Sequence, residues 1–290
     1  MAYRIKPGKK DVAAEVRRIA AEEFALMRRV LGDASSGPSV QVHEVRKSTK
    51  RLRSVLQLVE PVMPAAKTEM DVLRDAARSL SAARDTGAVV EALTRLELPA
   101  DTLHLTEAAL LRAKGEDLPQ EEAAELLRLF GKEMKAASRR AKDWTLEADG
   151  FDALAPGLKR SYRRLQKSFA DALTADEEEP LHEWRKRAKN HWHHALLLRR
   201  IHPDAMTAHG RTAEQVSDLL GDWRDLGLLS EAIAELPART LRKALAREIR
   251  EAAAAAQAKC LKEAVRPTRR LTAETPGALV RRFGAYWDAS

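Results

Sequence analysis

Two blocks of sequence occur twice in this chain, and this repeat constrains the fold more than any other feature. VHEVRKSTKRL at 42–52 matches LHEWRKRAKNH at 181–191, and LSAARDTGAVVEAL at 80–93 matches LGDWRDLGLLSEAI at 220–233. The two separations, 139 and 140 residues, are close to half of the 290-residue chain. Either match alone could arise by chance, but two matches at one separation indicate the tandem duplication of one structural unit.

Apolar residues recur with helical spacing along almost the whole chain, and no segment alternates with period two for long enough to suggest a sheet. Ala, Leu, Arg and Glu dominate, as is typical of a mostly helical protein. The pattern therefore predicts an all-α fold. A first helix ends before GDASSGP at 32–38, and a short one follows Pro276. Further helices are expected near 39–60, 65–95, 157–174, 178–200, 204–234 and 237–264, and helical stretches after Pro99 are broken around 114–119 and 148–157.

The first expected helix has one polar interruption in its apolar face. Val12, Val16, Ile19 and Met27 share that face, and Glu23 is the polar residue among them. The face as a whole is expected to pack against the core.

The duplicated helices each carry a basic face. Residues at i, i+3, i+4 and i+7 lie on one side of a helix. In the first repeat this side holds His43, Arg46, Lys47 and Lys50, and Arg53 extends it by a turn. The opposite, mostly apolar stripe should face the core.

The second repeat shows the same arrangement at the equivalent positions. Its basic face consists of His182, Arg185, Lys186, Lys189 and His193. The preceding helix adds a third cationic stretch, with Arg160, Arg163, Arg164 and Lys167 on one side.

Two explanations of these faces compete. A charged face on a surface helix is usually solvated, and a solvated face usually mixes signs because Glu–Lys pairs stabilise it. Here the acids are largely missing from three faces, two of them related by duplication. The chain carries a formal net charge of +8 and has a pI of about 9.6. The set of faces therefore favours an anion-binding site.

At the His-Glu-x-Arg-Lys helices the sequence resembles the CHAD family, the conserved histidine α-helical domain. The resemblance rests on VHEVRKSTKRLR and LHEWRKRAKNHWHHALLL, each followed by an Arg-Asp block, AARDTGAVVEAL and DWRDLGLLSEAI. The opening YRIKPG, EVRRIAAEEF and the segment GLKRSYRRLQKSFADAL are also similar, so the resemblance covers residues 3 to 287. The order and duplication of these motifs are more specific than any single one.

The resemblance implies two four-helix bundles related by pseudo-two-fold symmetry, with a basic central groove or pore that binds inorganic polyphosphate. The two halves would be residues 1–147 and 148–290, together one domain. Carried over position by position, the binding residues would be His43, Arg46, Lys47, Lys50, His182, Arg185, Lys186 and Lys189, with Arg53 and His193 extending the same faces and Arg17, Arg163 and Arg164 in support.

The two repeats differ after their shared lysine. Arg51-Leu52-Arg53 in the first repeat stands opposite residues 190–194, Asn-His-Trp-His-His, in the second. If the two halves contribute equally in the family, the second half could here bind less strongly or depend more on pH.

Polyphosphate suits the composition on physical grounds. A flexible polyanion without bases needs only a track of Arg and Lys, which bind phosphate oxygens. Aromatic residues, which are only 4% of the chain, are not interleaved with the basic ones, and this weakens a single-stranded nucleic-acid interpretation without excluding it. A phospholipid surface is a further binding alternative, and a metal-dependent phosphatase or kinase acting on polyphosphate is the enzymatic one.

Other candidate residues point mainly to structure. Asp85 and Asp225, the duplicated acids, are expected to pair with a basic residue of a neighbouring helix. His191 and His194 are spaced for a metal, but a cationic helix with one acid does not favour a cation site, so no metal and no cofactor are expected. No phosphate-binding Gly-Lys-Ser/Thr loop, G-x-S-x-G elbow or His-Glu-x-x-His helix is present, and no enzymatic activity is predicted.

The expected location is the cytoplasm, with association to polyphosphate granules and no membrane partner. The single cysteine, Cys260, fits a reducing compartment. The basic start MAYRIKPGKK has no apolar core of a signal peptide, and no stretch of about 18 apolar residues occurs.

Overall fold

The computed structural model describes residues 3–8, 11–33, 35–80, 86–113, 120–175, 177–237 and 239–290. These residues form α-helices joined by turns and short 3₁₀ segments, which confirms the predicted all-α fold. The helices are α1 (Val12–Leu31), α2 (Pro38–Val59), α3 (Ala66–Ser79), α4 (Thr86–Thr94), α5 (Ala100–Ala113), α6 (Gln120–Arg140), α7 (Ala155–Thr174), α8 (Glu178–Leu197), α9 (Pro203–Glu235), α10 (Lys243–Leu271) and α11 (Pro276–Asp288).

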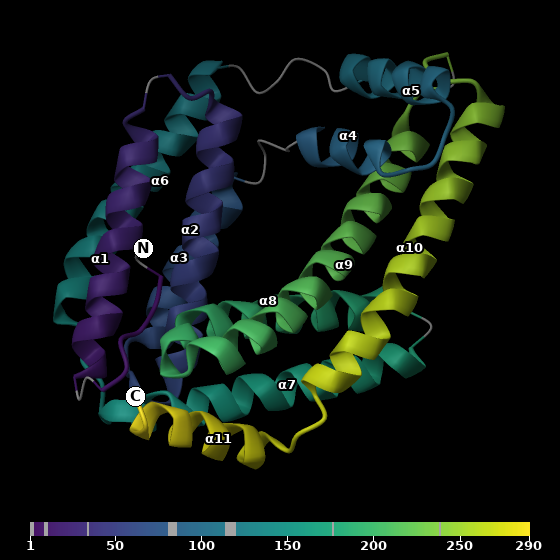
Figure 1. Cartoon of the computed structure of the whole chain (residues 1–290). Helices are drawn as coiled ribbons and strands as arrows, with labels where there is room; N and C mark the ends of the chain where they lie inside the picture. Colours follow the sequence, from purple (N-terminus) through teal and green to yellow (C-terminus); the bar gives the residue numbers. More distant parts are fainter. Residues whose placement is uncertain are drawn as a thin grey trace.

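The helices α1, α2, α3 and α6 pack side by side and form the first helical group (Figure 1). Their apolar stripes meet in one core that includes Ile19, Val45, Leu52, Leu73 and Phe130. The same core continues into the start of α7, the end of α8 and α11. The first group is therefore joined to the rest of the chain by shared apolar packing, beyond the covalent connection.

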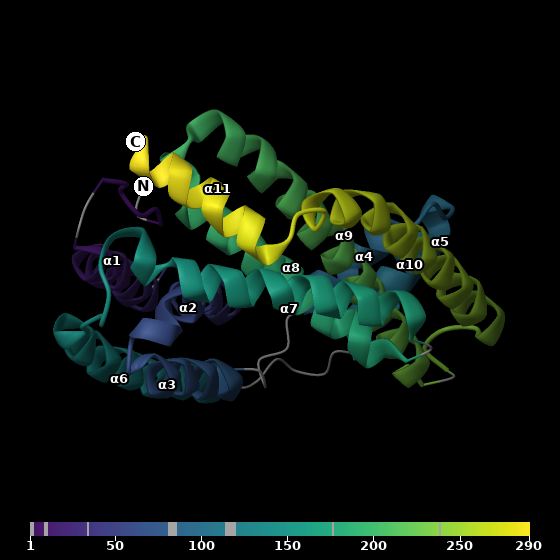
Figure 2. The same cartoon turned by 90° about the horizontal axis from the view of Figure 1, so that it is seen from below.

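The helices α7, α8, α9 and α10 form the second helical group, in which α9 and α10 are a long antiparallel pair (Figure 1). Trp184 of α8 lies in the core of this group with Leu165, Val216 and Ala264. The short helix α11 runs beside α7 along the outer side of the group (Figure 2).

The single helix expected over residues 65–95 is wrong, because the structure has two helices, α3 and α4, in this range. Helix α4 packs on α9, far from α3 (Figure 1). Its Leu93, with Leu110 of α5, joins an apolar cluster that contains Leu229 and Ile249 of the second group. The boundary predicted between residues 147 and 148 separates the repeats in the sequence. In the structure, however, α4 and α5, which precede this boundary, pack on α9 and α10, which follow it.

The repeats approach each other closely where α7 meets the end of α2. A Cβ atom added to Gly157 would overlap the backbone of Leu58. Glycine is therefore the residue that allows this approach. The pseudo-two-fold relation between the repeats stays a prediction.

The N-terminal segment is fixed on the helical framework. The amide of Ile5 donates a hydrogen bond to the carbonyl of Leu197 over 2.9 Å, and the Ile5 side chain is fully buried. The backbone oxygen of Ser290 lies 3.7 Å from the place of a Cβ atom built on Gly8, so this segment also meets the C-terminal end. Among the helices of the described ranges, none combines the length and the apolar character that crossing a bilayer requires.

Candidate functional site

Helix α2 presents the predicted faces. Pro38 occupies its first turn, where a proline costs no hydrogen bond. Val42, Val45 and Leu52 are buried, whereas Lys47 and Lys50 are exposed on the other side. The apolar and basic stripes predicted from the spacing are therefore separated in space on this helix.

Helix α8 repeats this arrangement beside α2. Trp184 and Ala188 are buried, Lys186 is exposed, and Arg185 and Lys189 are partly buried. Helices α2 and α8 are in contact, so the basic side chains of the two repeats come together. We call Arg46, Lys50, Arg185 and Lys189 the cation cluster.

The electrostatics of Lys50 show how close the members of the cation cluster lie. Its side chain is accessible to solvent, yet enough protein surrounds it that the charged form is poorly solvated. This burial, followed by the charges of Lys189, Arg46 and Arg185, lowers the pKa of Lys50 to about 8. Two repeats thus place cations so near one another that they disfavour the protonation of a lysine.

The second repeat's members of the cation cluster are perturbed in the same direction. Burial and the charge of Arg185 lower the pKa of Lys189, and burial lowers that of Arg185. The Nε of Arg185 is buried without a hydrogen-bond partner, and Lys189 lies 5.8 Å from the centre of the Trp192 ring. Within the described ranges, Lys50, Arg185 and Lys189 form no ion pair. These three charges are available to a ligand.

Asp225 lies next to the cation cluster without forming an ion pair with it. Its carboxylate is 3.8 Å from a guanidinium nitrogen of Arg95, a residue just beyond α4, and the same nitrogen is 3.1 Å from Asp222. Burial raises the pKa of Asp225, while the charge of Arg185 opposes this effect. Asp85, the counterpart predicted from the repeat, lies outside the described residues.

Other predicted residues surround the cation cluster. His43 is exposed on α2, and Lys47 lies 3.6 Å from Glu44. Lys186 is 2.8 Å from Glu183. His182 packs against Trp223, with ring centres 4.9 Å apart, and burial lowers its pKa. These side chains flank the cluster, and two of the lysines are already paired with acids.

Four predicted arginines take other positions. Arg17 donates a hydrogen bond over 2.7 Å to the backbone carbonyl of Trp144. Arg53 lies on the side of α2 that faces α3, where burial, followed by the charge of Arg74, lowers its pKa. Arg163 and Arg164 are exposed on α7 and make no ion pair with any residue in the described ranges.

His193 is not on the open face where its spacing placed it. Its side chain is only 5% exposed, and neither ring nitrogen has a hydrogen-bond partner among the described residues. Tyr3 of the N-terminal segment packs edge-on against its ring. Burial, followed by the charge of Lys189, lowers the pKa of His193 to about 3, so it is neutral at pH 7.

The two histidines with metal-like spacing are buried and point to different partners. Nε2 of His191 is 2.8 Å from Nε2 of His209 on α9, and Nε2 of His194 is 3.0 Å from the carbonyl of Ser54 on α2. Where the structure describes the chain, no group of three or more His, Cys, Asp or Glu could hold a metal ion. His191 and His194 instead connect α8 to neighbouring helices.

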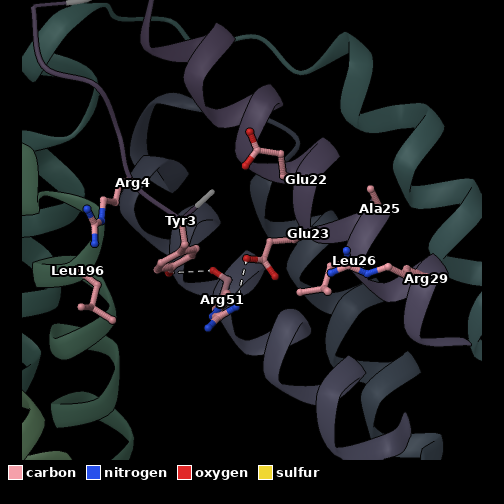
Figure 3. A pocket seen from close by; sticks show the side chains of 9 residues that line it. All are labelled: Tyr3, Arg4, Glu22, Glu23, Ala25, Leu26, Arg29, Arg51 and Leu196. Atoms are coloured by element: carbon pink, nitrogen blue, oxygen red, sulfur yellow. Dashed lines mark hydrogen bonds and ion pairs between the residues drawn. The ribbon is translucent and has the colours of Figure 1, made fainter. Parts of the chain in front are cut away.

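A pocket of about 870 Å³ lies between α1, α2 and the N-terminal segment, and sequence reasoning missed it (Figure 3). Tyr3, Glu23 and Arg51 point toward one another there: the Tyr3 hydroxyl donates to the Arg51 carbonyl over 3.1 Å, and the Arg51 guanidinium is 3.5 Å from Glu23. Burial raises the pKa of Glu23. The polar interruption of the first helix's apolar face was the available signal for this pocket.

Comparison with known proteins places the chain. Residues 12–234 match the family model described as "CHAD domain". The crystal structure of the CHAD domain from the plant Ricinus communis has the same fold, with a TM-score of 0.58, 18% identity, and coverage of 100% of this chain and 96% of that one. No curated protein matches the chain. Because the family match extends over most of the sequence, and both duplicated basic helices fall within it, the chain belongs to the CHAD domain family.

Proposed function

We propose that this chain binds inorganic polyphosphate at the cation cluster and releases it unchanged. The observation that supports the proposal is the meeting of Arg46 and Lys50 from one repeat with Arg185 and Lys189 from the other. Repulsion among them is unfavourable in the free protein. A polyanion that lies across the cluster removes this repulsion and gains contacts with both repeats.

The chemistry of the cluster suits phosphate better than a carboxylate or a single anion. Two guanidinium groups can bind phosphate oxygens in pairs, and two flexible ammonium groups can follow a chain whose path varies. A polymer with a negative charge on every unit can contact all four groups at once. Lys47, Lys186, His43 and His182 flank the cluster and would extend the track in both directions.

The surroundings of the cluster favour polyphosphate over a single-stranded nucleic acid. Binders of single strands stack bases on accessible aromatic rings. In this chain Trp184 and Trp223 are buried in helix packing, and Trp192 lies beneath the Lys189 ammonium. In cells, this activity would bring the protein to polyphosphate granules.

Titration with long-chain polyphosphate at low salt tests the proposal. We expect tight binding that weakens steeply as salt is added, because bound cations release counterions from the polymer. The variant R46E/K50E/R185E/K189E should retain its helical circular dichroism and lose binding. The matched control reverses four exposed arginines elsewhere, R128E/R139E/R247E/R250E, and should retain most of the affinity. Equal binding by the two variants would contradict the proposal.

Two further measurements separate the alternatives. Single-stranded DNA or RNA that displaces polyphosphate at equal phosphate concentration would favour a nucleic-acid binder. Incubation with polyphosphate and Mg²⁺, followed by phosphate release and chain-length analysis, would reveal an enzyme. We expect weak competition and an unchanged polymer.

A further inference from the structure

We propose that Lys50 is a site of direct acylation by acyl phosphates, and that this modification removes one charge from the cation cluster. The site is defined by its position. Lys50 is exposed on α2, forms no ion pair with any described residue, and is surrounded by Arg46 of its own helix and by Arg185 and Lys189 of α8. The proposal concerns a reaction of the protein that is separate from ligand binding.

Lys189 also forms no ion pair with any described residue and has Arg185 as a neighbour, but it is only partly exposed and lies against the Trp192 ring. The other nearby lysines are paired with acids. Lys47 on the same helix is 3.6 Å from Glu44, and Lys186 on α8 is 2.8 Å from Glu183. Lys167 on α7 is 2.8 Å from Asp171. A carboxylate beside an ammonium group stabilises its charged form, which is not a nucleophile. Lys50 is not paired with a carboxylate of any described residue. Burial, followed by the charges of Lys189, Arg46 and Arg185, favours its neutral amine, and the charge of Asp225 opposes this only in part.

The neutral amine is well populated at Lys50. Its pKa of about 8 leaves about a quarter of the groups neutral at pH 7.5, against roughly 0.1% for an ordinary lysine. The same neighbours attract the reagent, since an acyl phosphate is an anion and the local positive potential raises its concentration. Nucleophile and electrophile are thus both favoured at one position.

The reaction balances without a further reactant. The Nζ lone pair of Lys50 attacks the acyl carbon, a C–N bond forms, and the C–O bond to phosphate breaks. Inorganic phosphate leaves with the electron pair of that bond, and the amine loses a proton to solvent. The product is a neutral amide, so the cation cluster loses one of its four charges.

One consequence rests on the proposed function. If polyphosphate occupies the cation cluster, it should protect Lys50, both by excluding the acyl phosphate and by stabilising the ammonium form. Acylated protein should in turn bind polyphosphate more weakly. Selective acylation without protection would count against polyphosphate binding at the cluster, whereas polyphosphate binding without selective acylation would count against the present inference alone.

The experiment treats the full chain with acetyl phosphate at pH 7.5 and low salt, and follows the initial rate at each lysine by mass spectrometry. We expect Lys50 to react about ten times faster than Lys47, because its neutral fraction is larger. Across pH, the rate at Lys50 should reach half of its maximum near 8, as its pKa requires. A rate at Lys50 within twofold of that at Lys47, or a midpoint near 10, would overturn the proposal.

Two single-charge variants of α8 separate the neighbours' effect from general reactivity. K189Q removes the neighbouring charge with the largest effect on Lys50 and should slow its acetylation about threefold relative to Lys47. R187Q removes a charge that is paired with Glu183 and should leave the ratio unchanged. Equal ratios in the two variants would contradict the role of the cation cluster. Circular dichroism checks that each variant is folded, and the pH profile of the unmodified sequence stands independently of both.

Discussion

The two repeats of this chain share a sequence pattern, but their helices are arranged differently. In the second repeat, α9 runs without interruption from Pro203 to Glu235. The equivalent part of the first repeat forms α3, which ends at Ser79 within the first helical group, and α4, which packs on α9 itself. Helix α4 of the first repeat therefore covers part of the second repeat. A duplicated sequence can thus produce one interlocked domain instead of two separable ones.

The site shows the opposite relation, since here the repeats converge. Each supplies one Arg–Lys pair, and α2 and α8 bring the two pairs into a single cluster. Asp225 of the second repeat lies beside Arg185 in this cluster. Four predictions test this comparison, and we take them in order of expected effect.

The largest effect is expected where the repeats touch. In G157A the new methyl group would overlap the Leu58 backbone, so α7 must move away from α2. Because backbone cannot yield as a side chain does, we expect a loss of about 3 kcal/mol in the free energy of unfolding. Urea denaturation followed by circular dichroism measures it.

The control for this variant is a glycine inside the second repeat. Gly221 lies within α9, and no atom is found within 4 Å of a Cβ built there. G221A should therefore follow helix propensity alone and gain about 0.5–1 kcal/mol. A G157A protein as stable as the parent would show that the approach of the repeats is not tightly packed.

The second prediction asks whether the repeats contribute equally to binding. The differences after the shared lysine left open a second half that binds less strongly or depends more on pH, but the structure joins the four charges in one cluster. We therefore expect R46Q/K50Q and R185Q/K189Q each to lose about 100-fold in polyphosphate affinity, or about 2.7 kcal/mol. Calorimetric titration of both variants at one salt concentration compares them. A difference in affinity above tenfold between the two variants would show that the halves contribute unequally.

The third prediction concerns histidines that are buried in the second repeat. The histidines in the described part of the first repeat are exposed. The second repeat buries His191, His194 and His209, and burial lowers the pKa of each, to about 4 for His194 and His209. The unfolded chain takes up protons below its ordinary histidine pKa of about 6.5, whereas the folded chain does not until about 4. The stability present above pH 6.5 should therefore fall as the pH drops toward 4.

The expected size of this fall is about 1.5 kcal/mol per buried histidine between pH 6.5 and 5. Urea denaturation at these two pH values measures it, and H209Q should reduce the fall by that amount. H104Q, which changes an exposed histidine of the first repeat, is the control for the substitution itself. An equal effect of the two changes would mean that acid acts through the first repeat as well.

Periodicity and repeats predicted helix identity and the apolar and basic stripes well, because both follow from spacing along one helix. The expected helices at 157–174 and 204–234 agree with α7 and α9 within two residues. The break between α3 and α4 was not predictable in this way, because the matching sequence in α9 continues as helix. The end expected at 264 was early by seven residues, since α10 continues through Pro267 to Leu271.

Tertiary packing explains what spacing could not predict in the site. His193 has the correct spacing for the basic face, but Tyr3, distant in sequence, covers it. Arg53 similarly faces α3 instead of joining the cation cluster. Lys50 and Lys189, by contrast, could be recognised from the sequence as equivalent residues of one site, because duplication of a helix predicts duplication of its basic face.

The smallest effect is expected for the ion pair between Arg160 of α7 and Glu60 at the end of α2, which links the repeats beside Gly157. Both side chains are about one-third exposed, so solvent weakens their attraction. A double-mutant cycle with E60Q and R160Q should give a coupling of about 0.5–1 kcal/mol that decreases in 1 M salt. The exposed pair Arg128–Glu125 within α6 is the control and should couple by less. If the two coupling energies are equal, the Arg160–Glu60 pair adds no more stability than an ordinary surface pair, and the apolar contact of α7 with α2 holds the repeats together.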